Sequence, residues 1–557
     1  MPGALTVTKL GRTMGKSTII KKRLPYIGFA VSAGIWADLS ASIAPAAKDM
    51  EHCLYYEPDL FAGKNLAAAA VFAVIVYRFL LLIRDKAPDI KADAGGICSG
   101  KPEYLKVWGI LMVCWGLWWF IFFPGAAMND TISMMESPTG PTALMPPFYT
   151  AFIYWWMRIF TALLAGSSFA AFAVLVFVQM SLGASIVAYC YFWLWEKGVR
   201  PQYCKLFLVF YMLHPVVANY SITVVKDVPY AFLTLLLVPL LADLAAGKRN
   251  INKTQRILLI LSLAGIWACR SNGKYIVFLV CLMLALKVPD LRRLLAVFFI
   301  IMYLCNTAVV RYDRTRQPLD RSFAEAISVT YAQIGATVKS GGEIAAEDQE
   351  VLFQVLPEED WCRNYSFSFV DPIKFSSNFN IDYLNEHKTE YLQAWMHTLI
   401  RNPEVYFKAY GYHTYGFWNL GIAVRNLVDS TQSVFSRINN NTDNDSLWGK
   451  YLNEIGLHNA EFFPGNIGPM IKQVLRIAVF GSAGILGAGW LLLPMLICIF
   501  YVLLRKRYRL AMIFVPALGN WICMMLASPG SRIYRYNFYL LLSLPMFVMS
   551  TLMELKN

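Results

Sequence analysis

Charged side chains occupy the short polar segments between the long apolar runs of this sequence, and one carboxylate is placed for chemistry. Asp130 follows an apolar run that ends in Pro124-Gly125, so it lies close to the surface of any bilayer that the run crosses. A carboxylate there could act as general base for a hydroxyl that attacks a group carried on a membrane lipid. It could also cap the following helix by accepting hydrogen bonds from free backbone N–H groups. Local sequence alone favours the capping role.

Cationic residues lie in three other short segments that we place on the same side of the membrane. The polar residues of these segments that could bind a ligand are Lys226, Asp227, Arg270, Lys274, Arg532, Arg535 and Tyr536. The Lys226-Asp227 pair could be a helix start with a snorkelling lysine, or it could hold a phosphate or a metal beside Asp130. The planar fork of arginine suits phosphate oxygens. Anionic lipid headgroups would explain one cationic turn without catalysis, so three such turns make a phosphate-bearing ligand an equal alternative.

Histidines do not form a recognisable metal motif. All six fall outside the predicted membrane spans, and no HExxH or similar ligand spacing occurs. A dedicated zinc site is therefore not indicated. His214, which opens the second polar segment, and Glu136, which follows Asp130 in the first, remain further site candidates.

The elements that must position these residues are membrane-spanning helices. Hydrophobic residues make up 57% of the chain, against roughly 45–50% in soluble domains, and crossing a ~30 Å hydrocarbon core takes about 20 apolar residues. We predict an all-α polytopic membrane protein with about twelve transmembrane helices. The predicted spans are 25–46, 65–83, 107–124, 168–194, 204–214, which continues into the outer loop that His214 opens, 229–246, 256–270, 274–287, 293–310, 474–503, 509–527 and 536–553.

The distribution of Lys and Arg divides the loops into two sets, because short loops rich in these residues stay in the cytoplasm. Cytoplasmic loops lie around residues 84–106, 197–205, 248–256, 287–293 and 505–509, together with the N-terminus. The segments 47–64, 125–167, 214–228, 270–274, 311–470 and 528–535 then lie outside. The stretch 147–164 would invert this order as a span, so we place it along the outer interface. Topology thus accounts for the net charge of +14, and nucleic acid is not an expected partner.

This topology predicts three domains. Residues 1–310 form an N-terminal transmembrane module with the outer loops, 311–470 a mostly helical extracytoplasmic domain, and 471–557 the C-terminal transmembrane helices. The middle domain contains a helical-looking stretch at 382–400. It also contains aromatic residues that could stack on sugars, although core or membrane-facing roles are commoner for such residues: Trp361, Trp395, Tyr410, Tyr412, Tyr415 and Trp418.

With these residues in place, the chain resembles the membrane glycosyltransferases of the GT-C superfamily, in particular an uncharacterised bacterial branch, from end to end. The similar features are Asp130 after its Pro-Gly exit, the Pro146-Pro147 and Tyr149 continuation, the turn Lys226-Asp227-Val228-Pro229-Tyr230, the pair Arg535-Tyr536, and the segments Asn402-Pro403-Glu404-Val405-Tyr406 and Tyr415-Gly416-Phe417-Trp418. Each motif is short and weakly specific. Their order and sidedness are the stronger signal.

The resemblance implies a GT-C-like fold, a sugar donor linked through phosphate or pyrophosphate to a polyprenol, and transfer outside the cytoplasmic (inner) membrane of a bacterium. It makes Asp130 the base that deprotonates the acceptor hydroxyl. It makes Arg270, Lys274, Arg532 and Arg535 candidates for balancing the charge of the leaving phosphate, and Lys226 and Asp227 candidates for positioning donor or acceptor. Many relatives carry two adjacent acidic residues in the first loop, whereas this chain has Asn129 before Asp130. The resemblance therefore leaves open whether a divalent metal, Mg or Mn, takes part.

The function predicted on this basis is an inverting hexosyl- or pentosyltransferase that moves a sugar from a polyprenyl-phosphate donor to a glycan, lipid or protein acceptor of the cell envelope. A lipid-linked glycan polymerase or ligase is an alternative that would use an outer Arg/His pair and no essential carboxylate. A transporter or flippase of lipid-linked glycans would require functional charges in mid-membrane, which the sequence does not offer. A non-catalytic envelope scaffold is the last alternative.

Overall fold

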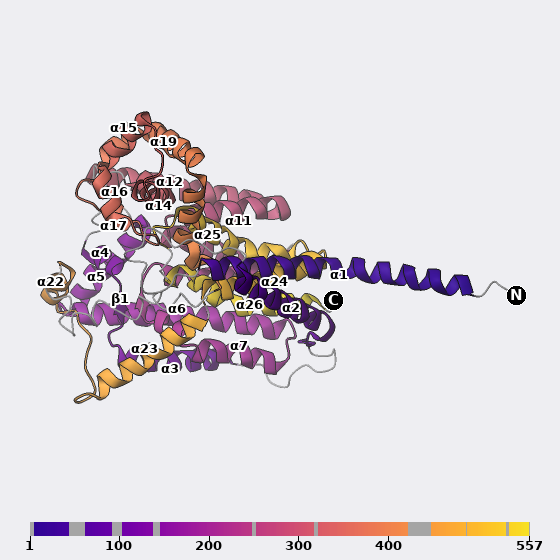
Figure 1. Ribbon diagram of the computed structural model, residues 1–557. Coiled ribbons are helices and arrows are strands. Elements are labelled where there is room, and N and C mark those ends of the chain that lie inside the picture. Colours follow the sequence, from indigo (N-terminus) through magenta and orange to yellow (C-terminus); the bar gives the residue numbers. More distant parts are fainter. Residues whose placement is uncertain are drawn as a thin grey trace.

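Long apolar helices form the body of the protein (Figure 1). The computed structural model describes residues 5–43, 62–91, 103–136, 145–247, 252–316, 321–420, 447–485, 487–530 and 534–555. The helices of the body are α1 (Leu5–Ser42), α2 (Gly63–Lys86), α3 (Tyr104–Ile121), α4 (Asn129–Glu136), α5 (Pro147–Leu163), α6 (Ser168–Glu196), α7 (Pro201–Leu213), α8 (Pro215–Ser221), α9 (Asp227–Ala245), α10 (Lys253–Cys269), α11 (Gly273–Lys287), η1 (Pro289–Leu291), α12 (Arg292–Arg316), α23 (Ile467–Ile485), α24 (Ala488–Leu504), η5 (Leu510–Phe514), α25 (Val515–Ala527), η6 (Tyr534–Asn537) and α26 (Phe538–Leu555).

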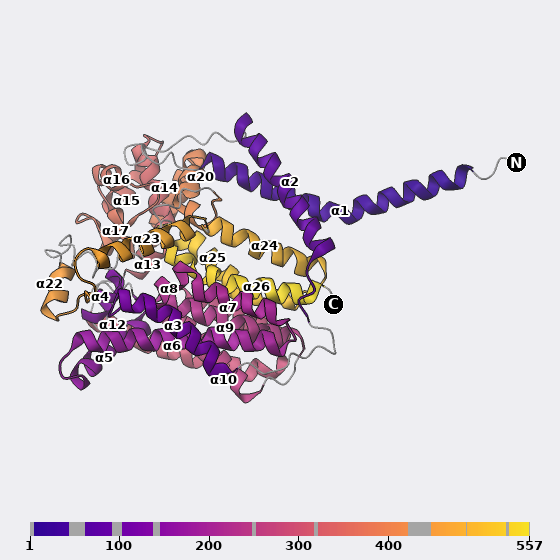
Figure 2. The same cartoon turned by 90° about the horizontal axis from the view of Figure 1, so that it is seen from below.

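Shorter helices form a second layer at one end of the body. They are α13 (Ser322–Ala326), α14 (Ser328–Lys339), α15 (Ala346–Val355), α16 (Glu358–Asn364), α17 (Asp371–Lys374), α18 (Ile381–Glu386), α19 (Lys388–Arg401), α20 (Pro403–Thr414), η2 (Tyr415–Phe417) and α22 (Leu447–Glu454). Helices α13 to α20, which we call the helical domain, lie away from the C-terminus in both views (Figures 1 and 2). The predicted helical stretch 382–400 is confirmed as α18 and α19.

Seven of the described helical segments are long and apolar enough to cross a membrane, and the pair α23 and α24, bent by 46°, would make an eighth. The seven are 63–86, 104–121, 168–196, 227–245, 289–312, 510–527 and 534–554. Four of the twelve predicted spans are not among these eight: 25–46, which overlaps α1, and the spans that correspond to α7, α10 and α11. The last three helices, with 13, 17 and 15 residues, are shorter than the roughly 20 residues that a full crossing needs. The predicted span 474–503 is two helices.

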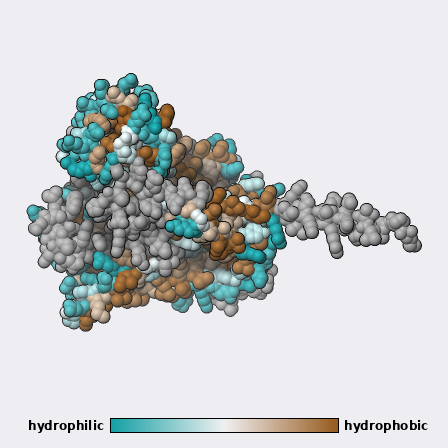
Figure 3. All heavy atoms as spheres, viewed as in Figure 1, coloured by the Kyte–Doolittle hydropathy of each residue, from teal (hydrophilic) through white to brown (hydrophobic). Residues whose placement is uncertain are grey.

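Helix α9 is the centre of the body. It packs against α6, α10 and α26. Of the residues in its apolar stretch, 89% are buried, as expected for a helix that is hydrophobic on all sides. Peripheral helices instead expose large apolar side chains, such as Leu105 and Val113 on α3. Figure 3 shows hydrophilic residues over the helical domain and hydrophobic ones over the adjoining helices. This distribution is that of a protein whose body faces lipid.

The helical domain has a core of its own, formed by residues such as Tyr331, Trp361 and Tyr391. The predicted domain limits at 310 and 470 both fall inside helices, α12 and α23. The reason at the first limit is that α12 continues past its apolar run into the charged residues that follow it. Helix α12 therefore ends several residues further along the chain than the change in hydropathy suggests.

Loops predicted on one side of the membrane meet at one end of the body. Lys91 and Val199, from two loops predicted as cytoplasmic, form an antiparallel bridge, and the Arg200 Nε donates to the Lys91 carbonyl at 3.0 Å. The turns that follow α3, α8, α10 and α25 meet one another instead, as described below. Two of the loops predicted as cytoplasmic are thus in contact with each other, and four of the turns predicted as outer are in contact at another place.

A two-stranded parallel pair joins the first two of these turns. Strand β1 (Ala126–Ala127) pairs with β2 (Thr223–Val224). The Asn459 side chain, which is buried, donates to the carbonyls of Phe122 and Gly125 at 2.9 and 3.0 Å. The backbone ahead of Asp130 is therefore fixed from two sides.

Replacing Gly125 by alanine should destabilise the protein. Gly125 has φ +139°, and a Cβ there would lie 2.5 Å from Val176 Cγ2, so the variant combines backbone strain of roughly 1–3 kcal/mol with a steric clash. The matched control is Gly116→Ala in α3, where a Cβ would meet nothing within 4 Å and helix propensity improves. Thermal unfolding in detergent should show a lower midpoint for Gly125→Ala only. Equal midpoints would mean that the turn relaxes freely.

Candidate active site

Two aspartates begin two helices at the same edge of the strand pair. Ala127 pairs with Val224, and Asp130 and Asp227 are each the third residue after their strand, in the first turns of α4 and α9. Parallel strands end at the same edge, so these first turns lie side by side. The Thr131 hydroxyl donates to the Val224 carbonyl and holds them in register. Carboxylates are also stabilised at helix N-termini by the helix dipole.

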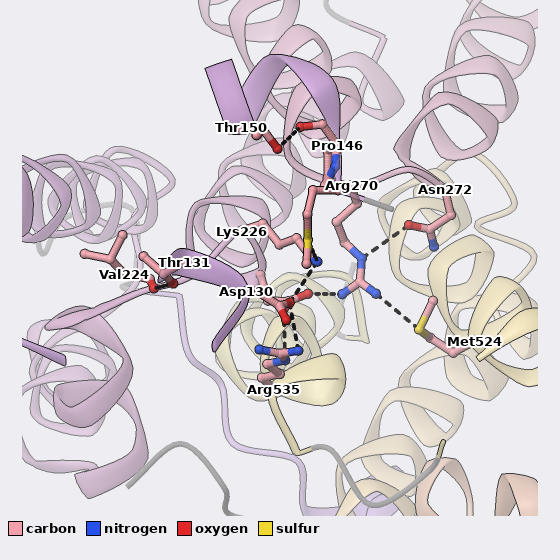
Figure 4. A network of polar contacts seen from close by, with 12 residues as sticks. Asp130, Thr131, Pro146, Thr150, Val224, Lys226, Arg270, Asn272, Met524 and Arg535 are labelled. Carbon is pink, nitrogen blue, oxygen red and sulfur yellow. Dashed lines mark hydrogen bonds and ion pairs between the residues drawn. The ribbon is translucent and has the colours of Figure 1, made fainter. Parts of the chain in front are cut away.

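Asp130 accepts from two cations on one carboxylate oxygen. Lys226 Nζ lies 2.9 Å and Arg535 Nη2 lies 3.0 Å from Asp130 Oδ2. Figure 4 shows the Lys226 and Arg535 side chains approaching Asp130 from different segments. No hydrogen bond reaches Asp130 Oδ1 from the residues that the structure describes. One oxygen is thus held by cations while the other is open to a ligand.

Asp227 is paired with Arg270. Arg270 Nη1 donates to Asp227 Oδ1, and both residues are buried, at 8% and 2% exposure. Arg535 Nε lies 3.4 Å from Asp227 Oδ2, but neither atom makes a hydrogen bond within the described part of the chain. Arg535 therefore bridges the two aspartates. Its Nε, a donor, lies next to Asp227 Oδ2, an acceptor, without a hydrogen bond between them.

Aromatic and polar side chains complete the surroundings of Arg270. Its guanidinium carbon lies 4.9 Å from the centroid of the Tyr536 ring and 5.6 Å from that of the Tyr230 ring, distances at which cation–π attraction operates. Arg270 Nε donates to Asn272 Oδ1 at 3.2 Å, and Nη2 lies 3.4 Å from Met524 Sδ. These contacts fix the plane of the guanidinium group.

The charges of this network do not cancel. Lys226, Arg270 and Arg535 carry three positive charges against two carboxylates, so the described cluster has a net charge of +1. Burial alone would raise the pKa of Asp130, but the charges of Arg535 and Lys226, together with their hydrogen bonds, outweigh burial and hold that pKa well below its ordinary value. The carboxylate is ionised at neutral pH, and the cluster as a whole favours an anion.

The capping interpretation of Asp130 is wrong, whereas the helix start predicted at Lys226-Asp227 is confirmed, without a snorkelling lysine. The hydrogen bonds that the Asp130 carboxylate receives within the described chain come from side chains, Lys226 and Arg535. Lys226 stands at the N-cap of α9 without a side-chain capping bond, and it reaches across to Asp130 rather than out to solvent. Local sequence favours capping because it cannot show that cations from distant segments converge here.

The structure brings together six of the predicted site residues and leaves others apart. Asp130, Lys226, Asp227, Arg270, Arg535 and Tyr536 form the network. Lys274 lies past the turn in α11, over the Tyr275 ring, and Glu136 is exposed at the far end of α4. His214 packs against Phe210. Within the described chain none of these three is ion-paired to the two aspartates. Arg532 lies outside the described residues.

The described residues of this site do not form an all-protein cage for a divalent metal. Groups of three or more His, Cys, Asp or Glu side chains able to hold a metal ion are absent from the parts of the chain that the structure describes. Asp130 and Asp227 each face cations already, so a further positive ion between them would be repelled.

Four residues of the network lie outside the predicted set, and one of them is Tyr230, whose ring faces Arg270. Asn272 and Met524 contact Arg270, and Asn272 Nδ2 donates to Asn520 Oδ1 at 3.1 Å. Asn520 is fully buried in the apolar helix α25. Its position was a usable signal, because a polar side chain inside an apolar helix is costly unless it has a partner.

Three of the six aromatic residues predicted as sugar-stacking candidates are core residues. Trp361 and Tyr412 are fully buried, and Tyr415 is nearly so. Tyr412 and Tyr415 pack with Phe367, and Trp361 packs with Tyr331. Trp395 and Trp418 donate their indole N–H groups to Gln333 and Thr414. The buried members cannot present a ring face to a sugar, so the stacking interpretation is wrong for them.

Fold and site together define an all-α protein with several helices able to cross a membrane and a buried charged cluster at one end. The chain belongs to the family of unknown function DUF6020, whose model matches residues 137–557. That range contains Lys226, Asp227, Arg270 and Arg535, whereas Asp130 lies shortly before it. No curated protein and no solved structure gives a significant match to the chain.

Proposed function

We propose that the protein is an inverting glycosyltransferase that moves a sugar from a polyprenyl-phosphate donor to an acceptor of the bacterial cell envelope, on the non-cytoplasmic side of the inner membrane. The observation that carries this proposal is the convergence of Asp130 with Lys226, Asp227, Arg270 and Arg535 from four separate turns. The GT-C-like arrangement, with about twelve spans, belongs to the same proposal.

The proposed reaction is a substitution at the anomeric carbon. The acceptor hydroxyl oxygen forms the new bond to that carbon, and its proton passes to the open Oδ1 of Asp130. The bond between the anomeric carbon and the phosphate oxygen breaks, and its electron pair leaves with polyprenyl phosphate. Because the pKa of Asp130 is low, the carboxylate accepts the proton late, once the forming bond has made the hydroxyl acidic.

The cations supply the other half of the reaction. The leaving phosphate gains negative charge as the bond breaks, and fixed positive groups in a partly dry site stabilise such charge strongly. Arg535 is the best placed cation for the leaving phosphate, because its Nε makes no hydrogen bond within the described chain and its Nη2 already contacts Asp130. Arg270 is held more firmly by Asp227 and Asn272 and acts as a fixed charge behind it.

The phosphate-binding part of the proposal is tested with Arg535→Met. Purified full-length protein should bind undecaprenyl phosphate, and the variant should bind it roughly ten- to a hundredfold more weakly, because a hydrogen bond to a charged group contributes about 1.5–3 kcal/mol. Binding of the uncharged polyprenol should not change. Arg292→Met, an exposed arginine at the start of α12, is the matched control. Equal affinity of wild type and Arg535→Met for undecaprenyl phosphate would contradict the proposal.

A further inference from the structure

The helical domain is attached to the turn that leads to Arg535. The Val370 backbone N–H donates to the Pro529 carbonyl at 2.9 Å, and Phe369 forms an antiparallel bridge with Gly530. A Cβ at Gly530 would lie 2.6 Å from Phe369 Cδ2, so the two backbones approach as closely as glycine permits. Buried His413 Nε2 lies 2.8 Å from the Ser528 carbonyl. These contacts fix the next residue of the domain, Asp371, relative to the end of α25, the helix whose Met524 contacts Arg270.

Asp371 has a partly open carboxylate. It begins α17, and its Oδ1 lies 3.0 Å from Lys374 Nζ. Lys374 is only 2% exposed and is also held by Glu325 Oε2 at 2.8 Å. The Asp371 side chain itself keeps 31% of its exposure, and its Oδ2 has no hydrogen-bond partner within the described chain. Lys374 therefore orients the carboxylate while one oxygen stays available.

Asp371 also responds to the charge of Asp130. Burial raises the pKa of Asp371, Lys374 opposes this rise, and the negative charges of Glu325 and Asp130 add to it. The two carboxylates thus belong to one electrostatic environment, one contributed by the body and the other by the helical domain. The cations that contact Asp130, in contrast, come from the body.

We infer that Asp371 is the acceptor-positioning residue of the site, that Lys374 orients it, and that the acceptor is a neutral glycan with free hydroxyl groups. This inference rests on the proposed function. An ionised carboxylate only accepts hydrogen bonds, which suits a hydroxyl and not a phosphate or carboxylate group of an acceptor. A neutral acceptor avoids repulsion by Asp130 and Asp371. The excess positive charge of Lys226, Arg270 and Arg535 is then left to bind the donor phosphate.

The test measures acceptor use separately from donor use. Wild-type protein is given polyprenyl-phosphate donors with radiolabelled hexoses and pentoses, with a panel of hexyl glycosides as acceptor probes. Asp371→Ala should raise KM for the hexyl glycoside roughly tenfold or more, with kcat and undecaprenyl phosphate affinity within twofold of wild type. Asp371→Asn, which keeps an acceptor oxygen, should give an intermediate KM. Asp382→Ala, an exposed aspartate in the first turn of α18, is the matched control.

The outcomes separate this inference from the proposed function. Release of polyprenyl phosphate together with an unchanged glycoside KM in Asp371→Ala overturns the inference and leaves the function standing. Release of polyprenyl phosphate without transfer to any hexyl glycoside also overturns it, because a neutral glycan is then not the acceptor class. Absence of any polyprenyl phosphate release overturns the proposed function and the inference with it. Thermal unfolding of each variant shows whether a change in KM comes from loss of the fold.

Discussion

Replacing Asp130 by asparagine is expected to lower the rate of sugar transfer by roughly a hundred- to ten-thousandfold, the usual contribution of a general base. Asparagine has nearly the same shape but cannot take the proton of the acceptor hydroxyl. Binding of undecaprenyl phosphate should persist, because Arg270 stays paired with Asp227 and Lys226 and Arg535 lose a competing anion. The measurement is the initial rate of transfer from a polyprenyl-phosphate-linked sugar, with lipid binding measured in parallel.

The control for this variant is Glu136→Gln, which neutralises an exposed carboxylate at the other end of the same helix, α4. It should transfer sugar at the wild-type rate. Full activity in Asp130→Asn would remove the proposed base and would favour a lipid-linked glycan polymerase or ligase, which needs no essential carboxylate. Movement of lipid-linked glycans across vesicles without any new bond would favour a flippase.

Truncating Asp227 to alanine is expected to have the largest effect on stability. Arg270 would remain buried with its charge unpaired, and removing one partner of a buried ion pair typically costs about 3–5 kcal/mol. Unfolding in detergent should shift to clearly lower denaturant concentration. The double variant Asp227→Ala with Arg270→Met should recover much of the loss, because no unpaired charge then remains in the protein interior.

An exposed ion pair provides the comparison. Glu103 and Lys106 form a pair at 2.8 Å with side chains 66% and 71% exposed, and such pairs contribute little because water screens them. Glu103→Ala should therefore unfold almost as wild type does. If Asp227→Ala were as stable as wild type, the Asp227–Arg270 ion pair would not contribute to the free energy of unfolding. The proposal that Asp227 holds Arg270 as a fixed charge behind Arg535 would then be contradicted.

Much of the helical architecture could be predicted from the sequence, because long apolar runs are a direct physical signal. The helices at 168–196 and 227–245 match predicted spans closely. The number of membrane crossings was harder to predict, since α10 and α11 are apolar but short. Hydropathy alone also does not show the 46° bend between α23 and α24.

The members of the charged cluster could be predicted, but their pairing could not. Cations are disfavoured on short outer turns, so Arg270 and Arg535, which lie on such turns, indicate a ligand or a partner. Which carboxylate each cation meets depends on the strand pair β1–β2, whose strands have two residues each and no sequence signature. Asp371 escaped prediction because it begins a four-residue helix, α17, far along the chain from Asp130.

The order of chain synthesis has a consequence for this cluster. The contact between Asp130 and Arg535 joins residues 405 positions apart, and Arg535 stands just ahead of the last helix, α26. A nascent chain therefore carries Asp130, Lys226, Asp227 and Arg270 well before the cation that bridges both aspartates is made. Because domains generally form from the N-terminus during synthesis, the charged cluster is completed only after Arg535 has been made, and shorter nascent chains lack the cation that bridges the two aspartates.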